Sequence, residues 1–376
     1  MINLLYITST YSGNYPLLNV QAALDKTKFK TIVCYLSGKN DGNNKIEKAG
    51  CKAIYLNIDK KKARWYRYSA ISKIRKIIEE ENIHIINCHR RRPTEIGVTA
   101  AWISKTNPAV FSTIHGTRNN KSIFRKLKEQ VINKILTGII CVSNGVKEYI
   151  VKTSWCLNEK KITVIQNGLP FDDFLVTRDK ADARNNFLPE VTAKYWFGTA
   201  GRLSTVKNHK TLIEAFAKFV DTTPDSVLVI AGTGPLETEL KDLVDKYGLN
   251  KKVFFLGFIT KIPEFLKAID VFVIPSLREG LCLALLEAMA SELPVIASNV
   301  GGIPEVFNEA EIGRLLEPLD TDGFALAMQE LISLPEKDFK KLGANAKERA
   351  VTNFSSTRMI KGYENVFEKE YGKRYV

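Results

Sequence analysis

The sequence predicts an α/β protein with two domains, each built around a parallel β-sheet. Short apolar segments rich in β-branched residues alternate with amphipathic stretches along almost the whole chain, a pattern typical of strands joined by crossover helices. The apolar segments lack a polar alternation, which indicates strands covered on both faces. A chain of 376 residues is also longer than one hydrophobic core comfortably supports, so two domains are expected.

The expected strands fall into two groups, each segment being chosen for its β-branched, apolar character. In the first half of the chain they span residues 2–7, 31–36, 53–56, 83–87, 110–114, 139–142 and 162–165. In the second half they span residues 195–200, 227–231, 253–256, 271–274 and 294–297. A final helix is predicted by apolar residues at helical spacing, namely Met359, Ile360, Tyr363, Val366 and Phe367.

The two groups of strands are separated by a segment without a clear apolar period. It contains Asn167, Gly168 and Pro170 among mixed charges, and such residues favour turns and loops. We therefore predict a first domain over residues 1–168, an interdomain linker over 169–190 and a second domain over 191–354.

Composition indicates the cellular environment of the protein and the class of partner that it binds. No apolar run approaches the roughly 18 residues that cross a bilayer, and residues 2–7 lack the flanks of a signal peptide, so we expect a cytoplasmic protein. The six cysteines are scattered without a CxxC pair, which favours buried thiols over disulfides or zinc. The formal net charge of +14 favours an anionic partner such as nucleic acid, an anionic membrane or a phosphorylated substrate.

Two glutamates in the second domain mark the first candidate site. Glu279 lies in the loop after the strand over 271–274, and Glu287 lies about one turn inside the helix that follows. Helix N-termini bind phosphate through their N–H groups, and here those groups fall between the two carboxylates. They belong to Gly280, Leu281, Cys282 and Leu283. A nucleotide-sugar presents ribose hydroxyls, pyrophosphate and donor-sugar hydroxyls in the matching order.

Glutamates at this spacing are usually solvated, but these two are embedded among leucines, where burying a carboxylate without a binding partner is costly.

A second candidate site is formed by Arg202 and Lys207. They follow the strand over 195–200, at the edge where open α/β sheets bind ligands. An arginine fork and a lysine point charge can clamp a pyrophosphate and stabilise the leaving group. By contrast, residues 232–235 (Gly-Thr-Gly-Pro) lack the third glycine of a dinucleotide fingerprint, so we interpret them as a tight strand-to-helix turn.

Together these motifs resemble the family-4 retaining glycosyltransferases, which have the GT-B fold of two facing Rossmann-like domains. The resemblance covers most of the chain after Ile135 and is specific in order and spacing. It rests on residues 140–143 (Ile-Cys-Val-Ser), 165–168 (Ile-Gln-Asn-Gly), 201–203 (Gly-Arg-Leu), 207–208 (Lys-Asn), 231–235 (Ala-Gly-Thr-Gly-Pro), 255–257 (Phe-Leu-Gly), 279–280 (Glu-Gly), 287–290 (Glu-Ala-Met-Ala) and 301–305 (Gly-Gly-Ile-Pro-Glu).

The resemblance implies roles for these residues. Arg202 and Lys207 would hold the diphosphate, Glu287 the ribose and Glu279 the donor sugar. The last helix, within residues 355–376, would cross back to the first domain. Transfer would be retaining, with the departing diphosphate helping to deprotonate the acceptor. We expect no organic cofactor and, because no metal-ligand cluster stands out, no metal; the donor is a UDP- or GDP-linked sugar.

The chain departs from the family pattern in two loops. Residues 279–284 read Glu-Gly-Leu-Cys-Leu-Ala where the family commonly has Glu-Gly-Phe-Gly-Leu-Pro, so the side chain of Cys282 must point away from the phosphates. The first glycine-rich loop, often Gly-Gly-Ala-Glu, is replaced by residues 11–16 (Tyr-Ser-Gly-Asn-Tyr-Pro). Gly13 is the best match there for close approach to the donor, and the divergence leaves the acceptor open.

The first domain offers candidates for contacts with donor and acceptor. His115 follows a strand and resembles the histidine of the family's Thr-x-His-Gly motif, which implies a hydrogen bond to the donor sugar or a phosphate. His89 is ambiguous, and the three arginines after it suit either an anionic acceptor or a solvated loop.

Two stretches of the first domain, residues 60–76 and 118–128, mix basic with aromatic or apolar residues. Near an anionic leaflet each basic residue contributes roughly 1 kcal/mol, and amphipathic aromatics favour the interface. Similar enzymes often glycosylate lipid-linked or cell-envelope acceptors, so we expect peripheral contact with the inner face of the plasma membrane. Ordinary solvated helix faces are the alternative. Rival functions are a sugar-nucleotide 2-epimerase or hydrolase on the same fold, and a nucleic-acid-binding protein, for which no recognition motif is found.

Overall fold

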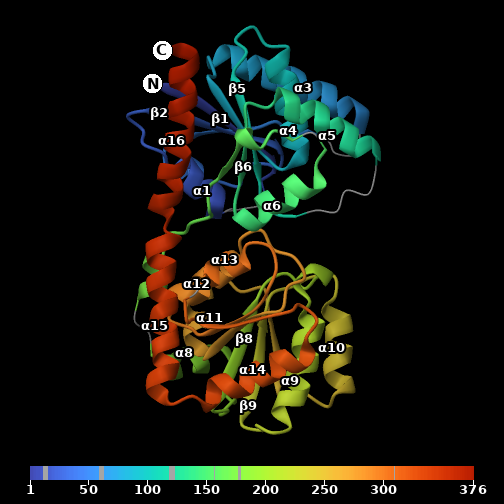
Figure 1. The fold of residues 1–376 in the computed structure, drawn as a ribbon, viewed down its shortest axis with the longest axis vertical. Coiled ribbons are helices and arrows are strands. Elements are labelled where there is room, and N and C mark those ends of the chain that lie inside the picture. Colours follow the sequence, from blue (N-terminus) through green and yellow to red (C-terminus); the bar gives the residue numbers. More distant parts are fainter. Residues whose placement is uncertain (12–15, 59–62, 118–122, 156, 177–178, 309) are drawn as a thin grey trace. The chain divides into compact units, whose positions relative to one another are not determined.

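The computed structural model describes residues 1–11, 16–58, 63–117, 123–155, 157–176, 179–308 and 310–376, and it divides into two compact units (Figure 1). Unit 1 comprises Met1–Gly168 and Ser356–Val376, and unit 2 comprises Leu169–Ser355. Each unit contains one parallel sheet with interleaved helices. This architecture confirms the predicted α/β class.

The sheet of unit 1 has the strand order β3-β2-β1-β4-β5-β6-β7, and all neighbouring pairs are parallel. Every strand expected in the first half is present. The strands are β1 (Ile2–Thr10), β2 (Phe29–Ser37), β3 (Lys52–Tyr55), β4 (Ile85–His89), β5 (Ala109–Ile114), β6 (Gly138–Cys141) and β7 (Ile162–Val164). The helices are α1 (Pro16–Ala22), α2 (Lys45–Lys48), α3 (Ala63–Glu80), α4 (Arg91–Trp102), α5 (Ile123–Ile135), α6 (Asn144–Thr153) and α16 (Ser356–Tyr375), with a 3-10 turn at Glu159–Lys161.

The sheet of unit 2 has the order β10-β9-β8-β11-β12-β13, again parallel throughout. Its strands are β8 (Tyr195–Ala200), β9 (Ser226–Ala231), β10 (Val253–Gly257), β11 (Val271–Ile274), β12 (Val295–Ser298) and β13 (Gly313–Leu316). Its helices are α7 (Asp172–Leu175), α8 (Lys180–Phe187), α9 (His209–Val220), α10 (Glu237–Lys246), α11 (Ile262–Ala268), α12 (Leu283–Ala290), α13 (Ile303–Phe307), α14 (Thr321–Ser333) and α15 (Glu336–Asn353), with a 3-10 turn at Thr205–Lys207.

The edge strand β13 was not expected from the sequence. It is four residues long, contains Gly313 and Arg314, and is half-buried along its whole length. Because an edge strand packs on fewer neighbours, it needs no two-sided apolar run, and the pattern used to find the other strands does not apply to it.

The last helix, α16, completes the core of unit 1 and runs beside α1 (Figure 1). The Tyr363 and Phe367 side chains are fully buried. Phe367 makes an edge-to-face contact with Phe111 of β5, and the Gln21 amide donates a hydrogen bond of 2.9 Å to the Tyr363 hydroxyl. The helix therefore belongs to the first unit although unit 2 separates it from the rest of that unit in sequence.

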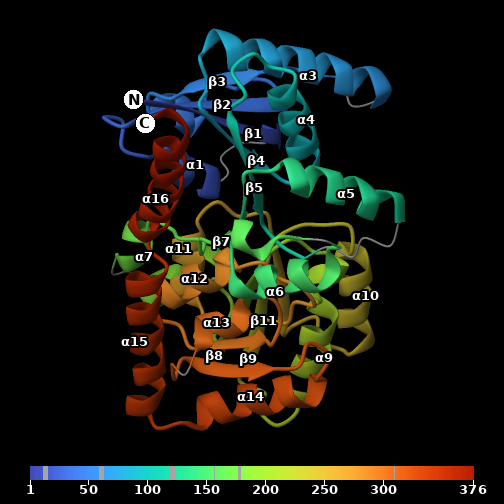
Figure 2. The ribbon, with the colours of Figure 1, turned by 45° about the horizontal axis from the view of Figure 1, so that its top comes forward.

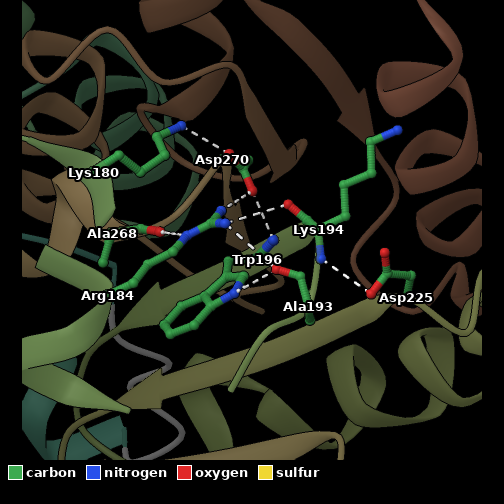
Figure 3. Close-up of polar contacts among 8 residues, drawn as sticks. All are labelled: Lys180, Arg184, Ala193, Lys194, Trp196, Asp225, Ala268 and Asp270. Atoms are coloured by element: carbon green, nitrogen blue, oxygen red, sulfur yellow. Dashed lines mark hydrogen bonds and ion pairs between the residues drawn. The ribbon is translucent and has the colours of Figure 1, made fainter. Parts of the chain in front are cut away.

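The predicted linker over residues 169–190 is wrong, because this segment folds as part of unit 2. Helix α8 packs against α11, and Figure 3 shows how Arg184 anchors it. The Arg184 guanidinium donates 2.6 Å to the Asp270 carboxylate, donates 2.9 Å to the Ala268 carbonyl, and lies 4.9 Å from the centre of the Trp196 ring. Lys180 forms a second ion pair with Asp270 at 2.8 Å (Figure 3).

This anchor explains the error. Ala183 is the one buried residue of α8 among the residues that the structure describes, so the helix has no apolar stripe to reveal it. Polar contacts to partners 84 and 86 residues away along the chain hold it, and a local periodicity cannot show such partners. Ser355, which we placed with the last helix, instead pairs with Leu169 in unit 2.

Cys34, Cys88, Cys141 and Cys282 are buried free thiols, as expected, whereas Cys51 is half-buried. Burial raises the pKa of Cys34 and of Cys141 to about 12, so both remain protonated at neutral pH.

Candidate functional site

The candidate site of unit 2 lies where β8 and β11 are neighbours in the sheet order β10-β9-β8-β11-β12-β13. The chain leaves β8 toward β9 on one side and enters β11 on the other, which makes this point the topological switch of the sheet. Open α/β sheets bind ligands at the carboxyl ends of the strands beside such a switch. Arg202 and Lys207 follow β8, and Glu279 follows β11.

The structure brings Lys207 and Glu279 into direct contact. The Lys207 ammonium lies 2.7 Å from Oε1 of Glu279, and the Ser276 hydroxyl donates to the same oxygen at 2.7 Å. Burial alone lowers the pKa of the Lys207 ammonium, but the adjacent Cys282 and Glu279 side chains outweigh that effect and raise it. Lys207 is therefore a permanent cation held at a fixed position beside a carboxylate. Sequence reasoning gave the two residues separate roles and missed Ser276.

Three glycines let the loops at this edge touch through their backbones. A Cβ added to Gly232 would lie 1.9 Å from the Gly201 carbonyl oxygen, and one added to Gly234 would lie 2.2 Å from that of Leu203. A Cβ on Gly301 would lie 1.9 Å from the Glu279 carbonyl oxygen, and Gly301 also has φ of +56°. Gly232 and Gly234 thus do more than form the predicted tight turn, because they admit the loop that carries Arg202.

Asn208 joins the same loops by hydrogen bonds. It takes the left-handed conformation between the Thr205–Lys207 turn and α9. Its side-chain amide donates 3.0 Å bonds to the carbonyls of Pro275 and Pro318. The position of Lys207 is therefore fixed from the β11 side as well as from its own strand.

Helix α12 begins after Cys282, so its N-terminus lies between the two glutamates as the sequence predicts. Gly280 and Leu281 form the bend before it, and Leu283 is its first residue. Burial raises the pKa of the Cys282 thiol to about 12, which makes it a neutral, buried group. Burial also raises the pKa of Glu287 from 4.5 to about 7. Because burial disfavours the charged form of this half-buried carboxylate, a hydroxyl group that donates a hydrogen bond to it would stabilise that form.

Arg202 is exposed just beyond β8. Within the part of the chain that the structure describes, its guanidinium makes no hydrogen bond or ion pair. It is therefore available to a ligand, in contrast to Lys207. No group of three or more His, Cys, Asp or Glu side chains in the described ranges is arranged to hold a metal ion.

In unit 1, His115 follows β5 and pairs with His89 at the end of β4. Nδ1 of His89 lies 2.8 Å from Nε2 of His115, and the rings are nearly parallel with their centres 5.1 Å apart. Burial, then the neighbouring His115 and Arg90, hold the pKa of His89 well below its ordinary value. Burial and Arg90 lower that of His115 to about 4, so both imidazoles are neutral at pH 7. Sequence reasoning did not foresee this pair.

The arginines after His89 begin α4. Arg90 has φ of +75°, which is strained for a residue with a side chain, and Arg90 and Arg92 are exposed at the carboxyl edge of the sheet. Arg91 is instead paired with Glu95 at 3.3 Å. Gly13, the last predicted donor-binding residue, lies outside the described residues.

Comparison with known proteins agrees with this geometry. Residues 182–349 match the glycosyl transferases group 1 family, and residues 17–173 match glycosyltransferase family 4. The chain is 31% identical over 302 residues to UDP-Gal:alpha-D-GlcNAc-diphosphoundecaprenol alpha-1,3-galactosyltransferase of Escherichia coli, covering 78% of this chain and 77% of that protein. It is 27% identical over 316 residues to N-acetyl-alpha-D-glucosaminyl L-malate synthase of Bacillus anthracis, covering 80% and 79%.

Solved structures give the same fold. A glycosyltransferase from Rickettsia africae ESF-5 superposes with a TM-score of 0.85 at 21% identity, over 100% of this chain and 99% of that one. Anabaena Alr3699/HepE in complex with UDP superposes with a TM-score of 0.84 at 18% identity, over 98% and 100%. The sequence match and the architecture together show that this chain belongs to the family-4, group 1 glycosyltransferases and has the GT-B fold.

Proposed function

We propose that this glycosyltransferase is a retaining, metal-independent enzyme that moves a sugar from UDP to a lipid-linked or cell-envelope glycan. The observation that carries the proposal is the contact of Glu279 with both Lys207 and Ser276 beside Cys282, the N-cap of α12, at the switch point of the unit 2 sheet. This cluster places a fixed cation, a carboxylate and a helix N-terminus together, as binding of a sugar diphosphate requires.

Each group takes one part of the donor. Arg202, Lys207 and the N-terminus of α12 hold the diphosphate, Glu287 accepts from the ribose diol, and Glu279 accepts from a sugar hydroxyl. As the bond between sugar C1 and the phosphate oxygen breaks, the acceptor oxygen forms a bond to C1 on the same face. The acceptor proton passes to the departing diphosphate. The cationic groups stabilise the charge on that leaving group, which is the task that a metal ion performs in other transferases.

The identity of donor and acceptor is supported by the relatives. The Escherichia coli enzyme is named for UDP-galactose and a diphosphoundecaprenol-linked acceptor, and other relatives are named for capsular polysaccharide and lipopolysaccharide core biosynthesis. The exposed Arg90 and Arg92 suit the diphosphate of such an acceptor. We further propose a cytoplasmic protein in peripheral contact with an anionic membrane. Of the basic residues in the stretch over 60–76, Lys61 and Lys62 lie outside the described residues, and the side chains of Arg64 and Arg67 are likewise not described. No helix in the described ranges is long and apolar enough to span a membrane.

The test combines binding with product analysis. Calorimetric titration should show tight binding of UDP and of a UDP-sugar and weak binding of GDP, unchanged by EDTA. Incubation of a UDP-sugar with an undecaprenyl-diphosphate glycan should then give a product whose anomeric configuration, read by NMR coupling constants, equals that of the donor. Inverted product, or activity abolished by EDTA and restored by a divalent ion, would overturn the retaining or the metal-independent assignment respectively. Equal consumption of the donor with and without acceptor would favour the hydrolase or epimerase alternative.

A further inference from the structure

The short helix α13 is held at its C-terminal end by a side chain from another helix. The Arg349 guanidinium of α15 donates hydrogen bonds of 2.7 Å to the Val306 carbonyl and 3.0 Å to the Glu305 carbonyl. Both carbonyls belong to the last turn of α13, where a basic side chain stabilises a helix. Because a helix of five residues has little stability of its own, this contact from α15 is expected to fix the position of α13.

Helix α13 is linked through Gly301 to the backbone of Glu279. Residues 299–302 connect β12 to α13. Within this connection Gly301 packs on the Glu279 carbonyl oxygen, which a Cβ on the glycine would approach to 1.9 Å. The Ile303 N–H donates to the Val300 carbonyl at 3.1 Å, so the connection turns directly into the helix. A displacement of α13 would therefore move the backbone that lies against Glu279.

The same helix, α15, also packs on α12, which carries Glu287 (Figures 1 and 2). A Cβ added to Gly343 of α15 would lie 2.2 Å from the carbonyl oxygen of Glu292, a residue that follows the end of α12. Lys347 of α15 forms an ion pair of 2.6 Å with the Glu292 carboxylate. Helix α15 thus holds both α12 and α13, the first by close packing and the second through Arg349.

We infer that Arg349 is a positioning residue of the transfer reaction. Acting through α13 and Gly301, it keeps Glu279 where the carboxylate accepts a hydrogen bond from the donor sugar. The inference rests on the proposed function for that role of Glu279. A hydrogen bond weakens when its distance or angle departs from a narrow range, so a small shift of Glu279 weakens the contact with the sugar. The diphosphate is held separately by Arg202, Lys207 and the N-terminus of α12. Loss of Arg349 should therefore affect the sugar more than the diphosphate.

The experiment titrates the full chain by calorimetry with UDP and with the tightest-binding of UDP-galactose, UDP-glucose and UDP-N-acetylglucosamine. The ratio of the two dissociation constants measures the contribution of the sugar. Arg349→Gln removes the charge and the hydrogen bonds to α13, and it should lower this contribution by about tenfold, the loss expected for one hydrogen bond to a charged acceptor. Arg349→Lys, which keeps a cationic donor, should retain part of it. The matched control is Lys340→Gln, which removes an exposed charge from the same helix and should behave like the wild type.

A residue that only stabilised the fold would give another result. Its loss would lower the thermal midpoint of unit 2 but leave the ratio of dissociation constants unchanged, provided that binding is measured well below that midpoint. An unchanged ratio in Arg349→Gln, or an equal loss in Arg349→Gln and Lys340→Gln, would overturn the inference.

Hydrogen–deuterium exchange of the ligand-free protein tests the coupling without any donor, because exchange reports local opening of the backbone. In Arg349→Gln the amides of residues 303–308 and of residues 277–283 around Glu279 should exchange faster than in the wild type. In Lys340→Gln neither segment should change. Faster exchange confined to residues 303–308 would contradict the inference, since α13 would then move without displacing Glu279.

The two readouts separate this inference from the proposed function. A wild type that binds neither UDP nor any of the three UDP-sugars, with faster exchange around Glu279 in Arg349→Gln, would overturn the proposed function and support the positioning of Glu279 by Arg349. A wild type that binds a UDP-sugar, with an unchanged ratio of dissociation constants in Arg349→Gln, would do the reverse.

Discussion

Replacing Glu287 by glutamine should separate two properties that its carboxyl group couples, the stability of the ligand-free protein and its affinity for the donor. Burial raises the pKa of Glu287 from 4.5 to about 7. Below pH 4.5 the group is protonated in both the folded and the unfolded chain. As the pH rises from 4.5 through 7, the unfolded chain ionises first, so stability falls. The shift corresponds to about 3 kcal/mol at pH 8, at 1.36 kcal/mol per pKa unit.

Glutamine has nearly the same shape and no charge, so Glu287→Gln avoids this loss. At pH 8 the free energy of unfolding of unit 2 should rise by up to about 3 kcal/mol, which for a unit of this size moves the thermal midpoint by roughly 6–12 °C. At pH 4 the two proteins should melt together. Differential scanning calorimetry of the ligand-free proteins between pH 4 and pH 8 measures both values. A midpoint difference that does not change with pH would refute the burial argument.

The same Glu287→Gln substitution should weaken donor binding, although it raises the stability of the ligand-free protein. Because the ribose diol needs an ionised acceptor, wild-type affinity for a UDP-sugar should be about tenfold weaker at pH 6 than on the plateau above pH 8. The Glu287→Gln variant should bind more weakly than this plateau and show no such dependence. A UDP-sugar serves better than UDP, because its phosphates do not titrate in this range. An equal pH dependence in both proteins would remove Glu287 from the ribose site.

Three further predictions follow from the same structure. Arg202→Ala and Lys207→Ala should each lower turnover by about 10²–10³-fold, as loss of a group that stabilises the leaving charge does, while Lys210→Ala, an exposed neighbour, should stay near wild type in the same steady-state assay. Phe367→Ala should lower the free energy of unfolding of unit 1 by about 3–5 kcal/mol, measured by urea titration; a change below 1 kcal/mol would mean that α16 contributes little to that core. Gly301→Ala should displace the Glu279 loop and weaken UDP-sugar binding in calorimetry more than it lowers the thermal midpoint.

The sheets could be predicted from the sequence because their strands are apolar on both faces, and that pattern is local. Two errors, β13 and α8, have the opposite character. Strand β13 lies at a sheet edge with Arg314 in its middle, and α8 is held by the contact of Arg184 with Asp270 rather than by an apolar stripe. Neither element contains the regularly spaced apolar residues by which a strand or a helix is predicted from the sequence.

The candidate site divides in the same way. Lys207, Glu279 and Glu287 could be proposed because they occur in motifs at strand ends. Their arrangement could not, because the ion pair of Lys207 with Glu279 joins positions 72 residues apart. A glycine is required at position 232 because the backbone of Gly201 lies against it. The sequence alone shows only that a turn is favoured there. The pairing of His89 with His115 depends likewise on the neighbouring register of β4 and β5.

Unit 1 is built from two segments that are separate in the chain, and this affects how it folds during synthesis on the ribosome. Residues Met1–Gly168 emerge first but lack α16, whose Tyr363 and Phe367 fill their core. Translation at roughly 5–20 residues per second places the final helix some 10–40 s behind. Unit 2, which is continuous in sequence, is synthesised during that interval, while the nascent first unit exposes the apolar surface around Phe111 that Phe367 later covers. Chaperone capture should therefore fall on the N-terminal half of the chain, and a chain that ends directly after Ser355 should contain a complete second unit beside an incomplete first one.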